Sequence, residues 1–128
     1  MAESAAFEGQ EFDWFARDAD GRFALFATAG SGPIPDVVLE CAAPHEAAAA
    51  LIVVSGWGSP EVWRSYSSVG LYVYDWNDQV YAYCRVAVPD GATEPSLYSA
   101  LASAVVPTYQ GQFGQALEVR FQELQHGT

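Results

Sequence analysis

The stretch GLYVYDWNDQVYAYCRVAVP, from Gly70 to Pro89, holds four of the seven tyrosines, one of the four tryptophans and a single arginine. Large residues alternate on both sides of its polar centre WNDQ (residues 76–79), a pattern typical of a β-hairpin. Both phases of the alternation carry large side chains. We expect one face of this hairpin to form core against helices. The other face, rich in tyrosine and acid, is expected to meet solvent, a loop or a partner.

A first hairpin is predicted upstream, in FDWFARDADGRFALFAT (residues 12–28). Apolar residues alternate in both of its halves, and DADG supplies the reversal because Gly21 can adopt the left-handed conformation. DADG resembles the start of a calcium loop, but the further ligands and the closing glutamate are missing. We therefore predict no calcium site, and neither a metal nor a cofactor elsewhere.

Helix signals account for most of the remaining chain. Pro35 and Asp36 suit the first turn of a helix that continues to Pro44, and a second helical piece then runs to Gly56. The tail LIVV of that piece is also compatible with a short buried strand. Three more elements are predicted: a short helix between Ser59 and Gly70, a helix capped by Ser96 and stopped before Pro107, and a strand from Leu117 to Leu124 with Leu117, Val119 and Phe121 inward.

This order of elements predicts an α+β fold, with a mostly antiparallel sheet of about five strands and helices packed on one face. The length of 128 residues and the 51% hydrophobic content indicate one domain covering residues 1–128, of which residues 1–10 are expected to be frayed. Cys41 and Cys84 lie far apart without metal-ligand spacing, and they are expected to be buried free thiols.

The N-terminal residues lack the basic and apolar regions of a signal peptide, and no apolar run approaches the roughly 20 residues that span a bilayer. We therefore expect a cytoplasmic protein.

Sixteen acidic residues face only five basic ones, all arginines, which gives a net charge of −11. This charge argues against binding to nucleic acid or to anionic membranes, because both require basic patches. It favours a basic protein partner through electrostatic steering. Acidity that serves solubility alone is the alternative reading.

Residue patterns for nucleophilic catalysis are missing from the sequence. The two histidines are His45, at a predicted helix start, and His126, near the C-terminus. The segment SGWGS (residues 55–59) does not have the G-x-S-x-G order of a nucleophile elbow.

Carboxylate pairs such as Asp75 with Asp78, or Asp13 with Asp18, would support glycosidase chemistry only if they converged in a cleft. Aspartate in turns already has a structural role, because its side chain bonds its own backbone. We predict that the protein is not an enzyme.

Tyrosine and tryptophan dominate the energetics of protein interfaces, and these residues are the remaining indication of function. The predicted contact surface combines acids of both hairpins with rings of LYVYDW. It consists of Asp18, Asp20, Tyr72, Tyr74, Asp75, Trp76 and Asp78.

The blocks DWFARDADGRFALFATAGSGPIP and EVWRSYSSVGLYVYDW resemble a family of small uncharacterised bacterial proteins. In that family a DWFA-x-D-x-DG hairpin and a glycine-proline loop precede a W-x-x-Y/F-x-x-x-G-L-Y-x-Y-D-W segment. In size and style the family is similar to immunity proteins of bacterial toxin systems. The resemblance implies no catalytic residue.

These observations together suggest a small acidic binding protein without catalysis, an immunity protein that neutralises a toxin by occluding its active site. The alternative is a stand-alone domain that binds a small molecule or forms a homodimer. Light scattering distinguishes a homodimer from a monomer with a free surface.

Overall fold

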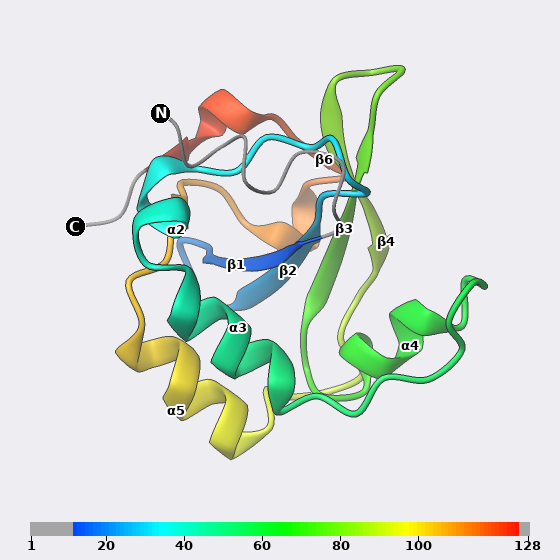
Figure 1. Ribbon diagram of the computed structural model, residues 1–128, viewed down its shortest axis with the longest axis vertical. Helices are drawn as coiled ribbons and strands as arrows, with labels where there is room; N and C mark the ends of the chain where they lie inside the picture. Colours follow the sequence, from blue (N-terminus) through cyan, green and yellow to red (C-terminus); the bar gives the residue numbers. More distant parts are fainter. Residues whose placement is uncertain (1–11, 126–128) are drawn as a thin grey trace.

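The computed structural model describes residues 12–125, which form one sheet with helices beside it (Figure 1). The strands are β1 (Asp13–Arg17), β2 (Phe23–Ala27), β3 (Tyr72–Asn77), β4 (Ala82–Ala87), β5 (Thr108–Tyr109), β6 (Glu118–Val119) and β7 (Leu124–Gln125). The helices are α2 (Asp36–Glu40), α3 (Ala42–Ala50), α4 (Val62–Ser67) and α5 (Pro95–Ser103), with short 3-10 turns η1 (Phe113–Gln115) and η2 (Phe121–Glu123). An α+β fold is confirmed. The frayed segment expected at residues 1–10, and His126, lie outside the described residues.

Both predicted hairpins are present, since β1 pairs antiparallel with β2 and β3 pairs antiparallel with β4. Gly21 has a φ of +80° in the first reversal, a conformation that glycine adopts without the strain of a Cβ atom. The second reversal comes later than WNDQ predicts. Trp76 and Asn77 still belong to β3, and Tyr81 takes the left-handed conformation, with a φ of +53°.

The strand order gives a mixed sheet, which corrects the prediction of a mostly antiparallel sheet of about five strands. Seven strands lie in the order β6-β4-β3-β2-β1-β5-β7, and the pairs β2–β3 and β1–β5 are parallel. The chain between β2 and β3 contains α2, α3 and α4. A connection of this length returns the chain to the end of the sheet where β2 began, so that β3 enters parallel to β2.

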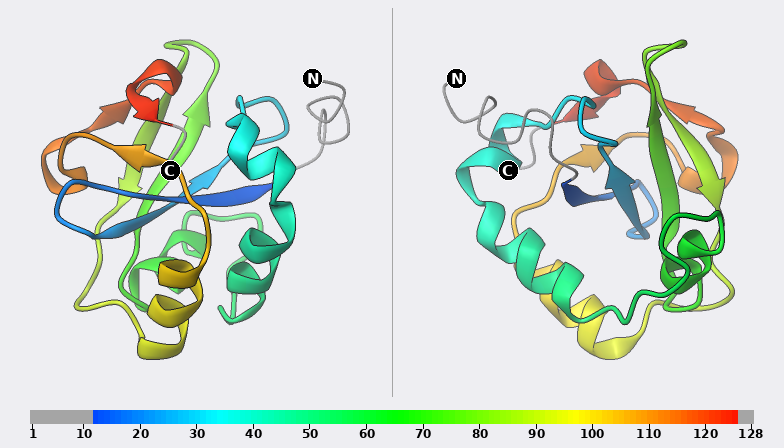
Figure 2. Two further views of the ribbon diagram at one scale, coloured as in Figure 1. Left: turned by 90° about the vertical axis from the view of Figure 1, so that its left-hand side faces the viewer. Right: turned by 45° about the vertical axis from the view of Figure 1, so that its right-hand side comes forward.

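The sheet curls until its two edges approach each other. β6 and β7 are the opposite edge strands, and a flat sheet of seven strands would separate them by about 29 Å. β6 ends at Val119 and β7 begins at Leu124. The five residue steps between them span at most about 18 Å. The joining segment, red in Figure 2, crosses from one edge to the other. The single strand predicted for residues 117–124 is therefore wrong: the chain bends at η2, and Leu117 is 70% exposed.

Both faces of the sheet are interior. α3, α4 and α5 cover one face (Figures 1 and 2), in a cluster that includes Phe15, Leu25, Tyr66, Val73, Leu97 and Leu101. The curl encloses a second cluster, covered by α2 and the C-terminal segment, which includes Trp14, Phe26, Tyr74, Tyr83, Phe113 and Val119. All five residues of β2 are buried as a result. The prediction of helices on one face holds for α3, α4 and α5, whereas α2 lies on the other face.

The first helical segment differs from its predicted boundaries. The break between α2 and α3 falls at Cys41, and Pro44 lies in the first turn of α3. Proline is tolerated there because an N–H in the first turn has no acceptor within the helix. α3 ends at Ala50, so that the LIVV tail (residues 51–54) belongs to neither a helix nor a strand.

The short helix α4 lies within the predicted segment, but it begins at Val62 with Glu61 at the N-cap position, so the predicted cap, Ser59, stands in the turn before it. Ser59 Oγ accepts a hydrogen bond from the Glu61 N–H at 3.3 Å, and Gly70 follows the helix with a φ of +92°. In α5 the predicted cap is wrong. The Glu94 carboxylate, not Ser96, accepts a hydrogen bond from the Leu97 N–H at 3.0 Å.

Candidate functional site

The structure does not bring the seven predicted contact residues together. Tyr74 lies in the interior. A hollow beside the first hairpin is lined by Asp18, Asp20 and Tyr72, although Asp18 itself is almost fully buried. Trp76 and Asp78 lie at the tip of the second hairpin, and Asp75 lies in a groove beside α4. Each location gives its residues a different role.

Asp18 organises the first hairpin from the inside, and it is only 3% exposed. Its Oδ1 atom accepts hydrogen bonds from the backbone N–H groups of Asp20 and Arg22, each at 2.9 Å. Its Oδ2 atom accepts from the N–H of Phe113 at 2.9 Å, and this bond fastens η1 to the hairpin. Asp18 therefore has a structural role, which the prediction of a contact residue did not include.

Tyr74 lies wholly in the interior enclosed by the curl. Its ring stacks on Phe26 with centroids 5.0 Å apart. Its hydroxyl donates to the Ala116 carbonyl at 2.6 Å, and the Phe113 carbonyl shares the same proton at 3.1 Å. Burial raises the pKa of this hydroxyl well above its usual value. The face of β3 that the sequence left open to a partner is thus covered by the returning C-terminal segment.

Four other predicted residues lie toward opposite ends of β3: Asp20 and Tyr72 near its start, and Trp76 and Asp78 near its end. Asp20 Oδ2 accepts a hydrogen bond from Gln112 Nε2 at 2.9 Å, in a shallow hollow also lined by Tyr72. At the hairpin tip, the indole N–H of Trp76 donates to Asp78. Both carboxylates are exposed but already accept hydrogen bonds within the chain.

A groove between α4, the connection before it and the sheet combines acidic and aromatic side chains. We call it the aromatic–acidic groove, and its volume is about 360 Å³. It is lined by Asp13, Ala27, Ala29, Trp57, Gly58, Ser59, Pro60, Val62, Trp63, Tyr66 and Asp75. Asp75 is the one residue of the predicted contact surface that lies in it.

Strand register explains why two distant carboxylates reach this groove. Asp13 lies opposite Ala27 across the β1–β2 pair, and Ala27 lies opposite Asp75 across the β2–β3 pair. The two aspartates therefore occupy one row of the sheet, about 10 Å apart at their Cα atoms. The methyl group of Ala27 between them leaves room. The Tyr66 hydroxyl lies 3.5 Å from Asp13 Oδ2, to which it donates.

The tryptophans come from α4 and from the connection that precedes it. Trp57 is 70% exposed and lies between Gly56 and Gly58, which have φ angles of +79° and +84°. This turn is tied to α4, because the Ser55 N–H donates to Ser65 Oγ at 3.0 Å. Trp57 is therefore an exposed ring on an anchored turn, whereas Trp63 is half-buried on the helix.

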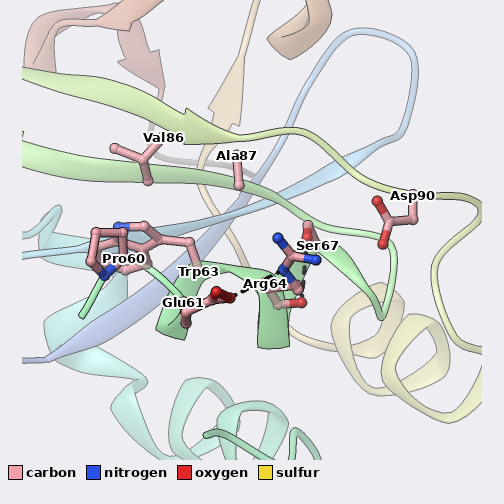
Figure 3. Close-up of a pocket in the computed structure, with 8 residues that line it drawn as sticks. All are labelled: Pro60, Glu61, Trp63, Arg64, Ser67, Val86, Ala87 and Asp90. Carbon is pink, nitrogen blue, oxygen red and sulfur yellow. Dashed lines mark hydrogen bonds and ion pairs between the residues drawn. The ribbon is translucent and has the colours of Figure 1, made fainter. Parts of the chain in front are cut away.

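A second groove, of about 570 Å³, lies between α4 and β4 (Figure 3). Figure 3 shows α4 residues on one side and Val86 and Ala87 of β4 on the other. Arg64 Nε and Glu61 Oε1 form an exposed ion pair at 3.3 Å on its rim. Trp63 lines both grooves. The second groove carries charges of both signs, which distinguishes it from the aromatic–acidic groove.

His45 is buried against β1, away from both grooves. Its Nδ1 atom accepts a hydrogen bond from the Phe15 N–H at 3.1 Å. Burial lowers the pKa of His45 to about 4, an effect that the neighbouring Val105 backbone partly opposes. The imidazole is thus neutral at physiological pH and serves the interior of the protein.

The cysteines and other possible metal ligands form no further site within residues 12–125. Cys41 and Cys84 are both free, but Cys41 is exposed and Cys84 half-buried, which corrects the expectation of buried thiols. Burial is the main cause that raises the pKa of the Cys84 thiol. Within residues 12–125, no three His, Cys, Asp or Glu side chains are grouped so that they could hold a metal ion. None of the helices described is long and apolar enough to cross a membrane.

Comparison of the chain with family models, with curated proteins and with solved structures finds no match. Sequence reasoning missed Asp13, Trp57 and Trp63 as members of one groove. A single signal pointed there: Trp57 stands between two glycines in SGWGS, as expected for a ring displayed on a turn.

Proposed function

We propose that this protein is a small acidic binding protein, not an enzyme, which recognises a basic region of a protein partner. The aromatic–acidic groove carries this proposal, because Asp13 and Asp75 line it together with Trp57 and Trp63. No arginine is among the described residues that line the groove. Carboxylates beside aromatic faces suit a cationic ligand.

The charge of the whole protein supports the same class of function. The exposed acids of the described part are Asp20, Asp36, Glu40, Glu46, Glu61, Asp78, Asp90, Glu94, Glu118 and Glu123. They are spread over several elements and do not form one plate around the second hairpin. Arg64 and Arg120 each pair with a nearby glutamate. The net charge of −11 provides long-range attraction for a basic partner, and salt weakens this attraction.

Exposed apolar side chains in the connection that precedes α4 supply contact area. Leu51 and Val53, in the connection that also carries Trp57, are 51% and 90% exposed. Tryptophan is strongly enriched among the residues that dominate binding energy at protein interfaces. Acidic side chains steer the partner, and the apolar residues of this connection slow its release.

Within this class we propose an immunity protein that occludes the active site of a toxin. The sequence resemblance to small bacterial proteins of this style supports the proposal. Toxins that act on phosphorylated or nucleic-acid substrates need basic clefts. An acidic protein that enters such a cleft excludes the substrate without any chemistry of its own.

A homodimer is the second candidate, favoured by the same exposed residues Leu51, Val53 and Trp57. Two copies that packed through this connection would bury apolar area that is otherwise in contact with water. Light scattering at several concentrations distinguishes the candidates, because the proposed function predicts a monomer in the absence of its partner.

A growth-rescue assay tests the proposed function. The chain is co-expressed in a bacterial host with the toxin-like product of a gene adjacent to its own, and growth is expected to recover. The double variant Asp13→Asn/Asp75→Asn is expected to lose this protection. Glu40→Gln/Glu46→Gln makes the same change in net charge on α2 and α3, away from the groove, and should retain it. Failure of the wild-type chain to protect, or equal protection by both variants, would contradict the proposal.

A further inference from the structure

We infer that the aromatic–acidic groove receives an arginine side chain of the partner. This inference rests on the proposed function and names the chemistry that the groove recognises. Its basis is the presence, in one cavity, of two carboxylates in one row of the sheet and of two indole rings.

The arrangement of the carboxylates suits a forked cation. Asp13 and Asp75 line the groove from the two sides of Ala27, whose small side chain separates them. Hydrogen bonding from Tyr66 to Asp13 limits the orientations of that carboxylate. A guanidinium group presents five N–H donors in a fixed plane, and it can address carboxylates along more than one edge.

The aromatic lining favours guanidinium over ammonium. Trp57 is exposed on one side of the groove, and Trp63 is half-buried on α4. Guanidinium groups stack flat on indole faces and are less strongly hydrated than ammonium groups. An arginine therefore uses both the rings and the carboxylates, whereas a lysine uses mainly the charge.

The size of the groove is sufficient for one long side chain. Its volume of about 360 Å³ lies near the lower end of the range of roughly 300–1,000 Å³ that small-molecule pockets occupy. A sugar ring could also stack on tryptophan and bond to carboxylates. The net charge of −11 favours the cation, because it raises the local concentration of cations and not of neutral sugars.

The test uses the full chain labelled with nitrogen-15 and three capped tripeptides, glycine-X-glycine, in which X is arginine, lysine or citrulline. Binding is followed through the indole N–H signals of Trp57 and Trp63, with Trp76 outside the groove as an internal reference. The arginine peptide is expected to shift the first two signals at millimolar concentration and to leave the third unchanged. Lysine is expected to bind several-fold more weakly, and citrulline, which is neutral, to cause no shift.

Variants separate the groove from the rest of the surface. Asp75→Asn and Trp57→Ala are each expected to weaken arginine binding by about tenfold. Asp90→Asn removes an exposed acid from the second groove and should change nothing. Trp57 is 70% exposed, so Trp57→Ala is expected to keep the fold. It therefore tests the groove even if Asp75→Asn disturbs the sheet.

Unchanged binding by the Trp57→Ala variant, equal binding of citrulline, or equal binding of lysine would overturn the inference. Displacement of the arginine peptide by a neutral oligosaccharide that binds more tightly would also overturn it. If the peptide does not bind while a protein partner does, in a manner that depends on Asp13 and Asp75, the inference fails and the proposed function stands. If the peptide binds but the chain protects against no toxin, the proposed function fails and the arginine site stands.

Discussion

Acidification should destabilise this protein through a single buried side chain, His45. The imidazole is 1% exposed, and its Nε2 atom makes no good hydrogen bond within the described residues. Burial lowers the pKa of His45 in the folded protein from 6.5 to about 4. One pKa unit corresponds to about 1.36 kcal/mol, so the folded state disfavours the imidazolium by about 3 kcal/mol relative to the unfolded chain.

The sign of the effect follows from proton binding. Between pH 6.5 and about pH 4 the unfolded chain holds the proton on His45 and the folded protein does not. The neutral imidazole makes its full contribution to the free energy of unfolding above pH 6.5. This contribution falls as the pH drops through the window and is lost below about pH 4. By about pH 5 the free energy of unfolding should have decreased by about 2 kcal/mol from its value at neutral pH.

Urea unfolding at about pH 7.5 and about pH 5 measures this decrease, with His45→Asn as the control. Asparagine offers an acceptor for the Phe15 N–H but does not titrate. Protonation of carboxylates relieves repulsion in a chain of net charge −11, and it acts on both proteins. The difference between them therefore isolates His45. If both proteins respond equally to pH, the assignment of acid sensitivity to His45 is refuted.

Three further substitutions test the packing. Asp18→Ala should lower the free energy of unfolding by about 3 kcal/mol, because three buried or part-buried N–H groups lose their acceptor; a loss below about 1 kcal/mol in urea unfolding would contradict this role. Tyr74→Phe should cost about 1–2 kcal/mol in the same assay, since the Ala116 carbonyl loses the Tyr74 donor whereas the Phe113 carbonyl keeps that of Arg85, and an unchanged midpoint would show that this bond is not needed. Gly70→Ala should destabilise more than a Gly91→Ala control, because a Cβ at Gly70 overlaps the Ala92 backbone at a left-handed φ whereas Gly91 has open space; equal thermal midpoints of the two variants would disprove this.

Local signals in the sequence predicted the hairpins and α4 because these elements are specified by neighbouring residues. Gly21 and Gly70 both take the positive φ angles that their positions suggested. Alternation of apolar residues identified the strands on each side of the turns. Such signals act over a few residues, and one sequence contains them in full.

The arrangement of the sheet could not be predicted in the same way. Whether β3 joins β2 in parallel depends on how the helices between them pack, and no local pattern encodes it. The tyrosine-rich face of β3 was assigned to a surface because its cover, Phe113 and Ala116, comes from a segment about forty residues later in the chain. A tyrosine such as Tyr74 can lie at the surface or in the interior, since in the interior its hydroxyl needs only a hydrogen-bond partner.

The groove was equally hidden from sequence reasoning. Asp13, Trp57 and Asp75 come from β1, the connection before α4 and β3. Their convergence depends on the register that places Ala27 between the aspartates. Asp75 was predicted as a contact residue for its charge, and the structure supplies the neighbours that turn this charge into part of a cavity.

Hydrogen–deuterium exchange with the proposed basic partner bound would show which surface of the protein the partner covers. Binding at the groove predicts slowed exchange in residues 55–66, at the start of β1 around Asp13 and in the second half of β3 around Asp75. Slowed exchange confined to the hairpin tip around Asp78, or to the hollow around Gln112, with the groove unchanged, would contradict it.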